Sequence, residues 1–355
     1  MGEPNKAKNR RPIPVLSLAA FVFAFFAVNW LIGLALPMQS MPVITPKLTW
    51  LREHGAEFDT LFLGSSRTYR QVVPELFDQL MAENGRPSRA FNLGVDGMRP
   101  PEDTFLLENA LPLLPKPRLV VVECNEIRVR VRAVDRDTVR QVYWHDWQRQ
   151  SVITQRAFFS DDPRKKLKSR FKEACRLWPD YTEHICYWLE NTSHLGRGIE
   201  LLTAATAPTV RPPMGLQDVG PELNGFRILP GHEQFEPGEL AEYESDLARL
   251  LAKPLPDNRG DSVSLAEIAE KRRIIERAGA RMVLVIPPYM DAFAFRPQEG
   301  GGVPPVLDLS SPQKYPEFYK VENRADSGHL NRAGSELYTR ELARQLTELV
   351  KGGRL

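Results

Sequence analysis

The sequence predicts an α/β protein: a flavodoxin-like doubly wound parallel sheet with a helical insertion and one N-terminal transmembrane helix. Three observations predict this class. Short apolar runs alternate with segments of helical periodicity on both sides of a long interruption. The runs are apolar at consecutive positions, which is typical of strands that helices cover on both faces of a parallel sheet. A long uncharged stretch stands near the N-terminus of a chain whose 355 residues also allow a substantial core.

The N-terminal segment predicts a membrane anchor. Four basic residues and one acidic residue lie among the first eleven, and 22 mostly apolar residues follow at 15–36. A helix of this length spans roughly 30 Å of hydrocarbon. The basic flank predicts that residues 1–14 stay in the cytoplasm and that the rest is exported, as in a single-pass inner-membrane protein with a periplasmic domain. A cleavable signal peptide is the alternative, but its apolar core is usually only about 7 to 15 residues.

The expected elements follow a connector at 37–57, with the folded domain beginning near Phe58. Residues 58–127 and 261–351 then form one α/β domain, and 128–260 form an insertion. The first half of the insertion mixes basic and aromatic residues and the second half is rich in Pro and Gly, so we expect a helical cap over the active edge, followed by loop. Strands are expected at 60–63, 90–93, 118–124 and 281–287, and helices at 74–83, 101–114, 264–280 and 331–351.

Two short motifs carry the candidate chemistry. Residues 64–68 read GSSRT directly after the first strand, and residues 326–329 read DSGH directly before the last helix. A serine becomes a nucleophile when a base takes its proton, and the base needs a third group to hold its tautomer. We therefore predict Ser66 as the nucleophile, His329 as the base and Asp326 as the orienting carboxylate of acyl transfer or ester hydrolysis.

Both motifs resemble blocks of the SGNH, or GDSL-type, hydrolase superfamily. Residues 64–68 look like the first block, with Ser65 where that block often has Asp, and residues 326–329 look like the last, the Asp-x-x-His. Ser65 is the alternative nucleophile, because the geometry of the turn decides which hydroxyl faces the cleft. Arg67 holds a carboxylate or a substrate oxygen in one interpretation and is a solvated side chain in the other.

The same resemblance supplies candidates for the oxyanion hole. Residues 92–97, NLGVDG, are similar to the second block, whose glycine donates a backbone N–H to the oxyanion. Gly97 is the match by alignment of the whole phrase, and Gly94 is the second choice. The third block has an asparagine after the third strand, and Asn125 is a displaced match. The resemblance covers roughly 58–127 and 264–350, and leaves the insertion unexplained.

An N-terminal anchor joined to a divergent domain of this superfamily is similar to proteins that acylate cell-envelope polymers, such as the alginate O-acetyltransferases and the D protein of lipoteichoic acid D-alanylation. That resemblance implies O-acetyl or similar acyl transfer to a glycan hydroxyl, with a polytopic membrane-bound O-acyltransferase as the partner. Two alternatives stay open. One is a membrane-tethered esterase with water as the acceptor, and the other is a scaffold that binds glycan or a membrane partner without turnover.

Composition argues against nucleic-acid binding and against a metal site. Lys plus Arg number 47 against 45 Asp plus Glu, a net charge of +2 that gives no reason to expect nucleic acid as a partner. Neither a Cys-x-x-Cys pair nor a histidine cluster has metal-ligand spacing, so we expect no metal, and no cofactor is expected either. Cys175 and Cys186 form a disulfide in one interpretation, with Cys124 left over, and all three are ordinary buried thiols in the other.

Overall fold

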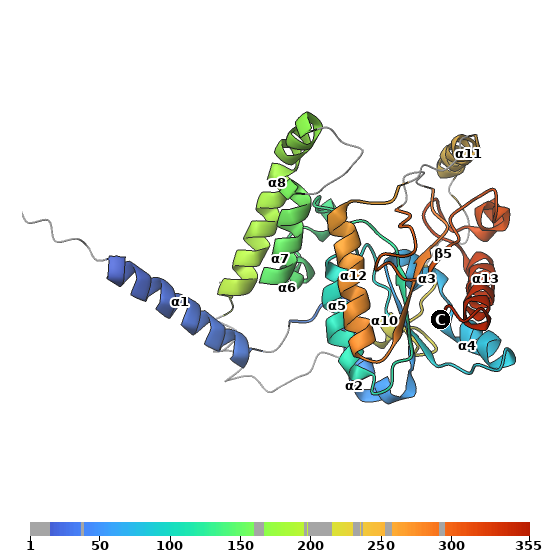
Figure 1. Cartoon of the computed structure of the whole chain (residues 1–355), viewed down its shortest axis with the longest axis horizontal. Helices are drawn as coiled ribbons and strands as arrows, with labels where there is room; N and C mark the ends of the chain where they lie inside the picture. The colour runs from blue at the N-terminus through green and yellow to red at the C-terminus, as the bar shows by residue number, and fades with distance from the viewer. Residues whose placement is uncertain are drawn as a thin grey trace, which may run out of the picture.

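The centre of the protein is a five-stranded sheet of order β2-β1-β3-β4-β5, in which all neighbouring strands are parallel (Figure 1). This is the strand order of flavodoxin-like doubly wound sheets. The predicted α/β class with a parallel sheet is therefore confirmed. The strands are β1 (Thr60–Leu63), β2 (Ala90–Asn92), β3 (Leu119–Glu123), β4 (Arg281–Ile286) and β5 (Val306–Asp308). The computed structural model describes residues 15–36, 39–159, 167–194, 197, 215–229, 235, 237–252, 258–290 and 295–355.

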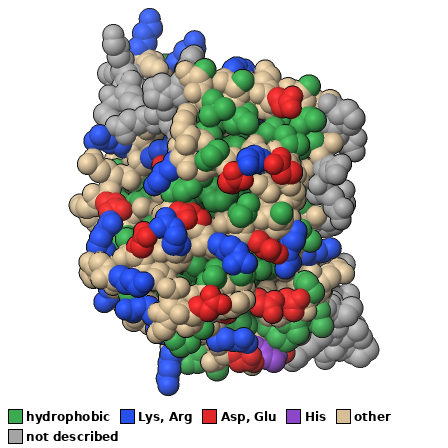
Figure 2. Space-filling model, turned by 90° about the vertical axis from the view of Figure 1, so that its right-hand side faces the viewer, with side chains coloured by type: hydrophobic (Ala, Val, Ile, Leu, Met, Phe, Trp, Pro, Cys, Tyr) green, Lys and Arg blue, Asp and Glu red, His purple; other side chains and the backbone are tan. Residues whose placement is uncertain are grey.

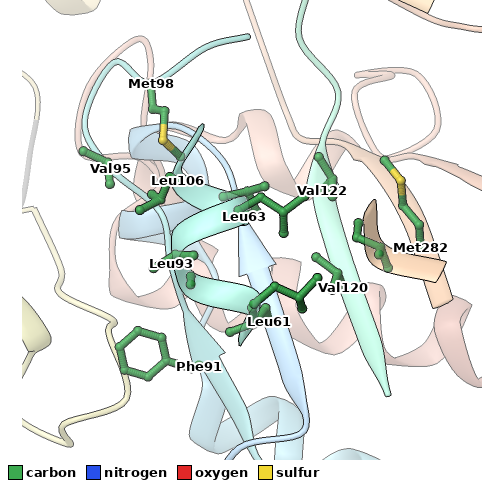
Figure 3. Packing of buried hydrophobic residues seen from close by; sticks show 14 of the residues in the cluster. Leu61, Leu63, Phe91, Leu93, Val95, Met98, Leu106, Val120, Val122 and Met282 are labelled. Atoms are coloured by element: carbon green, nitrogen blue, oxygen red, sulfur yellow. The ribbon is translucent and has the colours of Figure 1, made fainter. Parts of the chain in front are cut away.

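Helices cover both faces of the sheet (Figure 1). Because side chains alternate along a strand, Leu61 and Val120 pack on one face with Leu106 of a covering helix (Figure 3), whereas Phe62 and Val121 pack on the other. The helices of the first face are α2 (Ile44–His54), α5 (Glu102–Ala110) and α12 (Ser262–Arg277), and those of the second are α3 (Ser66–Gln71), α4 (Pro74–Glu83) and α13 (Arg332–Lys351).

The folded domain begins earlier than the sequence predicts. Helix α2 lies inside the expected connector at 37–57, and its Ile44, Leu48 and Leu51 are almost fully buried in the first core. Pro46 stands in the first turn of α2, where a missing N–H costs no helical hydrogen bond. The prolines that suggested a connector therefore mark the start of a core helix, and most of the predicted connector is wrong.

Helix α1 (Val15–Ala35) is the candidate membrane segment. Its window Leu16–Leu34 is long and apolar enough to cross a membrane, and only 6% of that window is buried by the rest of the protein. A core helix of the domain would be mostly buried, so α1 is not one. The basic residues on which the predicted orientation depends fall within 1–14, outside the described residues.

The insertion at 128–260 is expected to form one helical cap, but the parts of it that the structure describes pack in separate places. Its helical part consists of α6 (Val139–Trp144), α7 (Trp147–Thr154), a π-helical segment (Gln155–Phe159) and α8 (Leu167–Ser193), which pack together. Beyond it, α10 (Leu216–Val219) leads into a segment beside the edge strand β2, where Asn92 N–H donates to Asn224 O at 2.7 Å. Helix α11 (Pro237–Leu251) contributes Leu250 to the second core.

Of the two interpretations of the cysteines, the structure does not show the disulfide between Cys175 and Cys186. Both residues lie on α8, eleven positions apart and exposed, and both are free thiols. A rise of about 1.5 Å per residue separates their Cα atoms by roughly 16 Å, whereas a disulfide needs less than about 7 Å. Cys124 is a buried free thiol after β3.

Short 3₁₀ segments complete the described elements, at Gly55–Glu57, Leu111–Leu113, Ala133–Asp135, Pro316–Tyr319 and Val321–Asn323. The side of the molecule that carries α4 and α13 has basic and acidic side chains interspersed over its surface (Figure 2). On α13 they form pairs one helical turn apart, such as Arg332 with Glu336 and Arg344 with Glu348. This surface is locally neutral.

Candidate active site

The turn after β1 presents Ser66 and holds Ser65 inside. Ser65 is the N-cap of α3, where its Oγ accepts the Arg67 N–H at 3.3 Å. The Ser65 hydroxyl also donates to the Glu123 carboxylate at 2.8 Å and is almost fully buried, whereas Ser66 is half-buried. Gly64 leaves no room for a side chain, because a Cβ there would lie 2.1 Å from Thr68 Oγ1. Of the two serines, only Ser66 faces the histidine.

The structure brings Ser66, His329 and Asp326 together in one relay. His329 Nε2 lies 2.8 Å from Ser66 Oγ, and His329 Nδ1 lies 2.9 and 3.0 Å from the two oxygens of Asp326. A carboxylate only accepts hydrogen bonds, so Nδ1 carries the proton and Nε2 accepts the serine O–H. This is the tautomer in which a histidine works as a general base.

Asp326 is held as an ion by its own turn. Its Oδ1 accepts the backbone N–H groups of Gly328 at 2.6 Å and His329 at 2.7 Å. Burial acts to raise the pKa of Asp326, but the bond from the His329 ring, the charge of His329 and these two N–H groups outweigh it, so the pKa is lowered. The carboxylate therefore stays charged and can stabilise a protonated His329.

Arg324 holds the same turn from the protein interior, and no sequence motif predicts this role. Its side chain is completely buried and donates to the carbonyl oxygens of Asp326 at 3.1 Å, Ser327 at 2.7 Å and Phe318 at 3.1 Å. Three carbonyls of a loop thus converge on one guanidinium, which has five donors in a rigid plane. Nothing local in the sequence marks this arginine as buried.

Glu123, at the end of β3, connects the turn that contains Ser65 and Ser66 to the sheet. Its carboxylate accepts the Ser65 N–H at 2.7 Å, the Thr68 hydroxyl at 3.0 Å and Arg67 Nε at 2.9 Å. Burial acts to raise the pKa of Glu123, but the charge of Arg67 and the hydrogen bonds from Ser65 and Asn125 more than offset it, so the pKa is lowered. Glu123 is thus a buried anion paired with Arg67, which also lies 4.0 Å above the Tyr289 ring.

Asn125 also lies in this network. It is beside Arg67, the residue that follows the candidate nucleophile Ser66. Its Oδ1 accepts from Arg67 at 3.0 Å and from Arg99 at 3.3 Å. The two guanidinium groups fix the orientation of the amide, because the oxygen must face them. Arg67 is therefore not the solvated side chain of the second interpretation, and it holds both a carboxylate and the predicted oxyanion residue.

The loop after β2 separates the two candidate glycines. Gly94 donates its N–H to Asn92 Oδ1 at 2.9 Å, so this amide is already engaged. Gly97 has φ +70, a conformation that favours glycine, and its N–H has no acceptor within the described part of the chain. The Asp96 carbonyl accepts from Arg140 of α6 at 2.8 Å. In a trans peptide the next N–H points the opposite way, so Arg140 aims the Gly97 N–H away from itself.

Lys47 of α2 supports this loop, although it falls in the segment expected to be a connector. It is completely buried, and its Nζ donates to the carbonyls of Asn92 at 2.9 Å and Gly94 at 2.7 Å and lies 3.7 Å from the centre of the Tyr69 ring. Burial and the nearby charge of Arg70 lower its pKa well below the ordinary value. Lys47 is thus a structural clamp under the second motif.

A buried histidine pair, His145 and His184, lies in the insertion. His145 Nε2 is 2.6 Å from His184 Nδ1, and His184 Nε2 is 2.6 Å from Val129 O. Burial and the proximity of His184 lower the pKa of His145 well below its usual range, although a contact with Gln141 O acts to raise it. Burial also lowers the pKa of His184 to about 4. Both rings are therefore neutral at physiological pH.

The sequence matches no protein-family model and no curated protein. No group of three His, Cys, Asp or Glu side chains with the geometry of a metal site occurs among the residues that the structure describes. The geometry itself offers a hydroxyl, a base bonded to it and an ionised carboxylate behind the base. Such an arrangement can transfer an acyl group through a covalent serine ester.

Proposed function

We propose that this protein is a membrane-anchored serine acyltransferase that moves an acetyl or similar acyl group to a hydroxyl of a cell-envelope glycan outside the cytoplasm. One observation carries the chemistry: His329 Nε2 lies 2.8 Å from Ser66 Oγ while the same ring bonds to Asp326. Membership of the SGNH superfamily is part of this proposal. Its support is the parallel sheet of order 2-1-3-4-5 and the position of both motifs at the carboxyl edge.

In the first step Ser66 Oγ attacks the carbonyl carbon of an acyl donor, and its proton passes to His329 Nε2. Asp326 stabilises the imidazolium that forms. The Gly97 N–H and the Asn125 amide are the groups we assign to the developing oxyanion. The imidazolium then gives its proton to the leaving oxygen, and the acyl group remains on Ser66. In the second step the acceptor hydroxyl loses its proton to His329, attacks the serine ester and frees Ser66.

Water competes with the glycan as the acceptor. The side chains of His329 and Asp326 are 21% and 26% exposed, so solvent reaches the base when no substrate is bound. We therefore expect slow ester hydrolysis when no glycan is present. The resemblance adds a polytopic membrane-bound O-acyltransferase as the supplier of acyl groups, and release of acetate in its absence would measure the esterase side reaction.

The first test is labelling of the full chain in detergent with a serine-directed fluorophosphonate. Wild type should be labelled, and Ser66→Ala and His329→Ala should lose the label. Ser327→Ala is the matched control, because Ser327 is exposed in the same turn and contributes only its backbone oxygen. Ser65→Ala should keep the label, at a lower rate because the turn loses the hydrogen bonds of the Ser65 hydroxyl to Glu123.

Absence of labelling in folded wild type would reject an activated serine and favour a non-catalytic scaffold. A label retained by Ser66→Ala and lost by Ser65→Ala would exchange the roles of the two serines. A separate reaction gives unlabelled protein an acetyl donor with and without a soluble glycan that has free hydroxyls: acetylated glycan supports transfer, and free acetate alone supports the esterase. Release of the full-length chain from membranes by salt would contradict a spanning α1.

A further inference from the structure

A cavity of about 380 Å³ lies beside the candidate oxyanion loop, with Gly97 in its wall. Five arginines and two acids line it, which leaves three positive charges in excess. The two acids are Glu102 and Asp135, and each already pairs with an arginine, Glu102 with Arg140 and Asp135 with Arg132. The lining arginines are Arg99, Arg128, Arg130, Arg132 and Arg136.

The local sequence explains how the arginines gather. Residues 127–132 read IRVRVR, and burial alternates along them: Ile127, Val129 and Val131 are buried, whereas the arginines between and after them are exposed. In an extended chain successive side chains point to opposite sides, and residues two apart lie about 7 Å from each other. The apolar side chains fix the segment to the protein, and the arginines line up on its other side.

Three of these arginines have no acidic partner among the residues that the structure describes. Arg132 pairs with Asp135, and Arg136 pairs with two acids of α8. No carboxylate in the described parts of the chain pairs with Arg99, Arg128 or Arg130. This contrasts with α13, where basic and acidic side chains pair along the surface (Figure 2). Unpaired guanidinium groups in one hollow repel each other, so the free protein keeps them together at a cost that an anion would remove.

The cavity shares wall residues with a second cavity that reaches the residues next to Ser66. A smaller cavity, of about 40 Å³, has Arg99 and Arg128 in its wall as well, together with Arg67 and Asn125. Arg67 follows the proposed nucleophile directly. Burial and the nearby charges of Arg128 and Arg67 lower the pKa of Arg99. Glu126 is the one acid in the wall of the smaller cavity.

We infer that the arginine-lined cavity binds an anionic group of the substrate, a carboxylate or a phosphate, and so positions the ester or the accepting hydroxyl next to Ser66. Guanidinium groups bind both anions through paired N–H donors. The positioning part of this inference rests on the proposed function, whereas the binding part does not. The ligand is a molecule with an oxyanion several bonds away from the reacting oxygen, either a uronic acid residue or a phosphorylated glycan or lipid.

The binding test uses the full chain in detergent and isothermal titration calorimetry with inorganic phosphate, sodium glucuronate and glucose. Phosphate or glucuronate should bind and neutral glucose should not, and the tighter of the two anions identifies the source. Arg128→Gln with Arg130→Gln should weaken binding by at least about a hundredfold, since each charge-assisted hydrogen bond contributes about tenfold or more. The control Arg332→Gln with Arg344→Gln removes two charges from α13 and should leave binding unchanged.

The positioning test compares two esters with five-carbon acyl chains, 4-nitrophenyl valerate and mono-4-nitrophenyl glutarate, of which the first ends in a methyl group and the second in a carboxylate. The Arg128/Arg130 double variant should raise KM for the anionic ester by about tenfold or more and leave the neutral ester unchanged. Equal binding of either anion by wild type and double variant overturns the cavity assignment. Anion binding that also persists in Ser66→Ala, together with failure of fluorophosphonate labelling, would keep the binding site and reject the serine chemistry. A labelled serine without anion binding would do the reverse.

Discussion

Replacing Glu123 with Ala should both destabilise the protein and disorder the nucleophile turn. Glu123 is fully buried and ionised, and its partners are Arg67, the Ser65 N–H and hydroxyl, and the Thr68 hydroxyl. Removing one member of a buried ion pair leaves the other charge unpaired, which costs about 3 to 5 kcal/mol of unfolding free energy. The surface variant Glu336→Ala, which breaks an exposed pair, should cost less than about 1 kcal/mol.

Urea unfolding of the full chain in detergent, followed by tryptophan fluorescence, measures this effect. The double variant Glu123→Met with Arg67→Met removes both charges and fills their volume, so it should recover most of the loss, since apolar replacement of a buried pair is often nearly neutral. Fluorophosphonate labelling of Ser66 should nevertheless stay slow in the double variant, because the Ser65 N–H still lacks its acceptor. A single variant that loses less than about 1 kcal/mol, or a double variant as unstable as the single, would refute the buried ion pair.

Three further predictions concern the histidine turn and the insertion. Asp326→Asn places an amide against His329 and favours the wrong tautomer, so kcat for ester hydrolysis should fall by about 10³ to 10⁴-fold with little change in KM; an unchanged kcat would contradict the relay. Arg324→Met removes the donors to three turn carbonyls and should lower kcat and the labelling rate, whereas Arg344→Met on the α13 surface should not alter either. Because burial lowers the pKa of His184 to about 4 from 6.5, its stabilising contribution is complete above pH 6.5 and falls as the pH drops toward 4. His184→Phe should therefore lose about 3 kcal/mol less than wild type between pH 7 and 4 in urea unfolding, and parallel pH curves for the two would contradict this.

The sheet was predictable where apolar runs are long enough to stand out. Four strands and four major helices lie within a few residues of their predicted positions, because burial on both faces of a parallel strand leaves a continuous apolar signature. β5 has only three residues, Val306–Asp308, and gives no such signature. Helix α2 was not predicted for another reason. Its prolines are typical of a linker, and only tertiary packing shows that Ile44 and Leu48 belong to the core.

Some residues of the candidate site were likewise predictable from the sequence and others were not. Ser66, Asp326 and His329 were predictable, because the chemistry imposes a local pattern on each motif and their order agrees with the topology of the sheet. Glu123 was not, because its partner Ser65 is 58 residues away and nothing at the end of β3 announces a buried acid. The alternation at 127–132 is a signal that the sequence does contain, although its meaning depends on which side faces a cavity.

Two loops that carry candidate catalytic groups, the glycine loop and the histidine turn, are held from inside by basic side chains. Lys47 binds carbonyls of the glycine loop, Arg140 binds the Asp96 carbonyl, and Arg324 binds carbonyls of the histidine turn. A cation that binds a peptide oxygen turns the following N–H the opposite way, because the peptide group is planar and trans. At Asp96 this leaves the Gly97 N–H without an acceptor among the described residues. The N–H groups that follow the carbonyls bound by Lys47, those of Leu93 and Val95, instead donate to Phe62 O at 2.7 Å and Gly64 O at 3.0 Å. Lys47 therefore fixes the loop against β1 and the turn after it, and Arg140 orients the Gly97 donor that the proposed function assigns to the oxyanion. The buried charges are costly to desolvate, and under the proposed function a fixed donor at Gly97 is the reason to retain them.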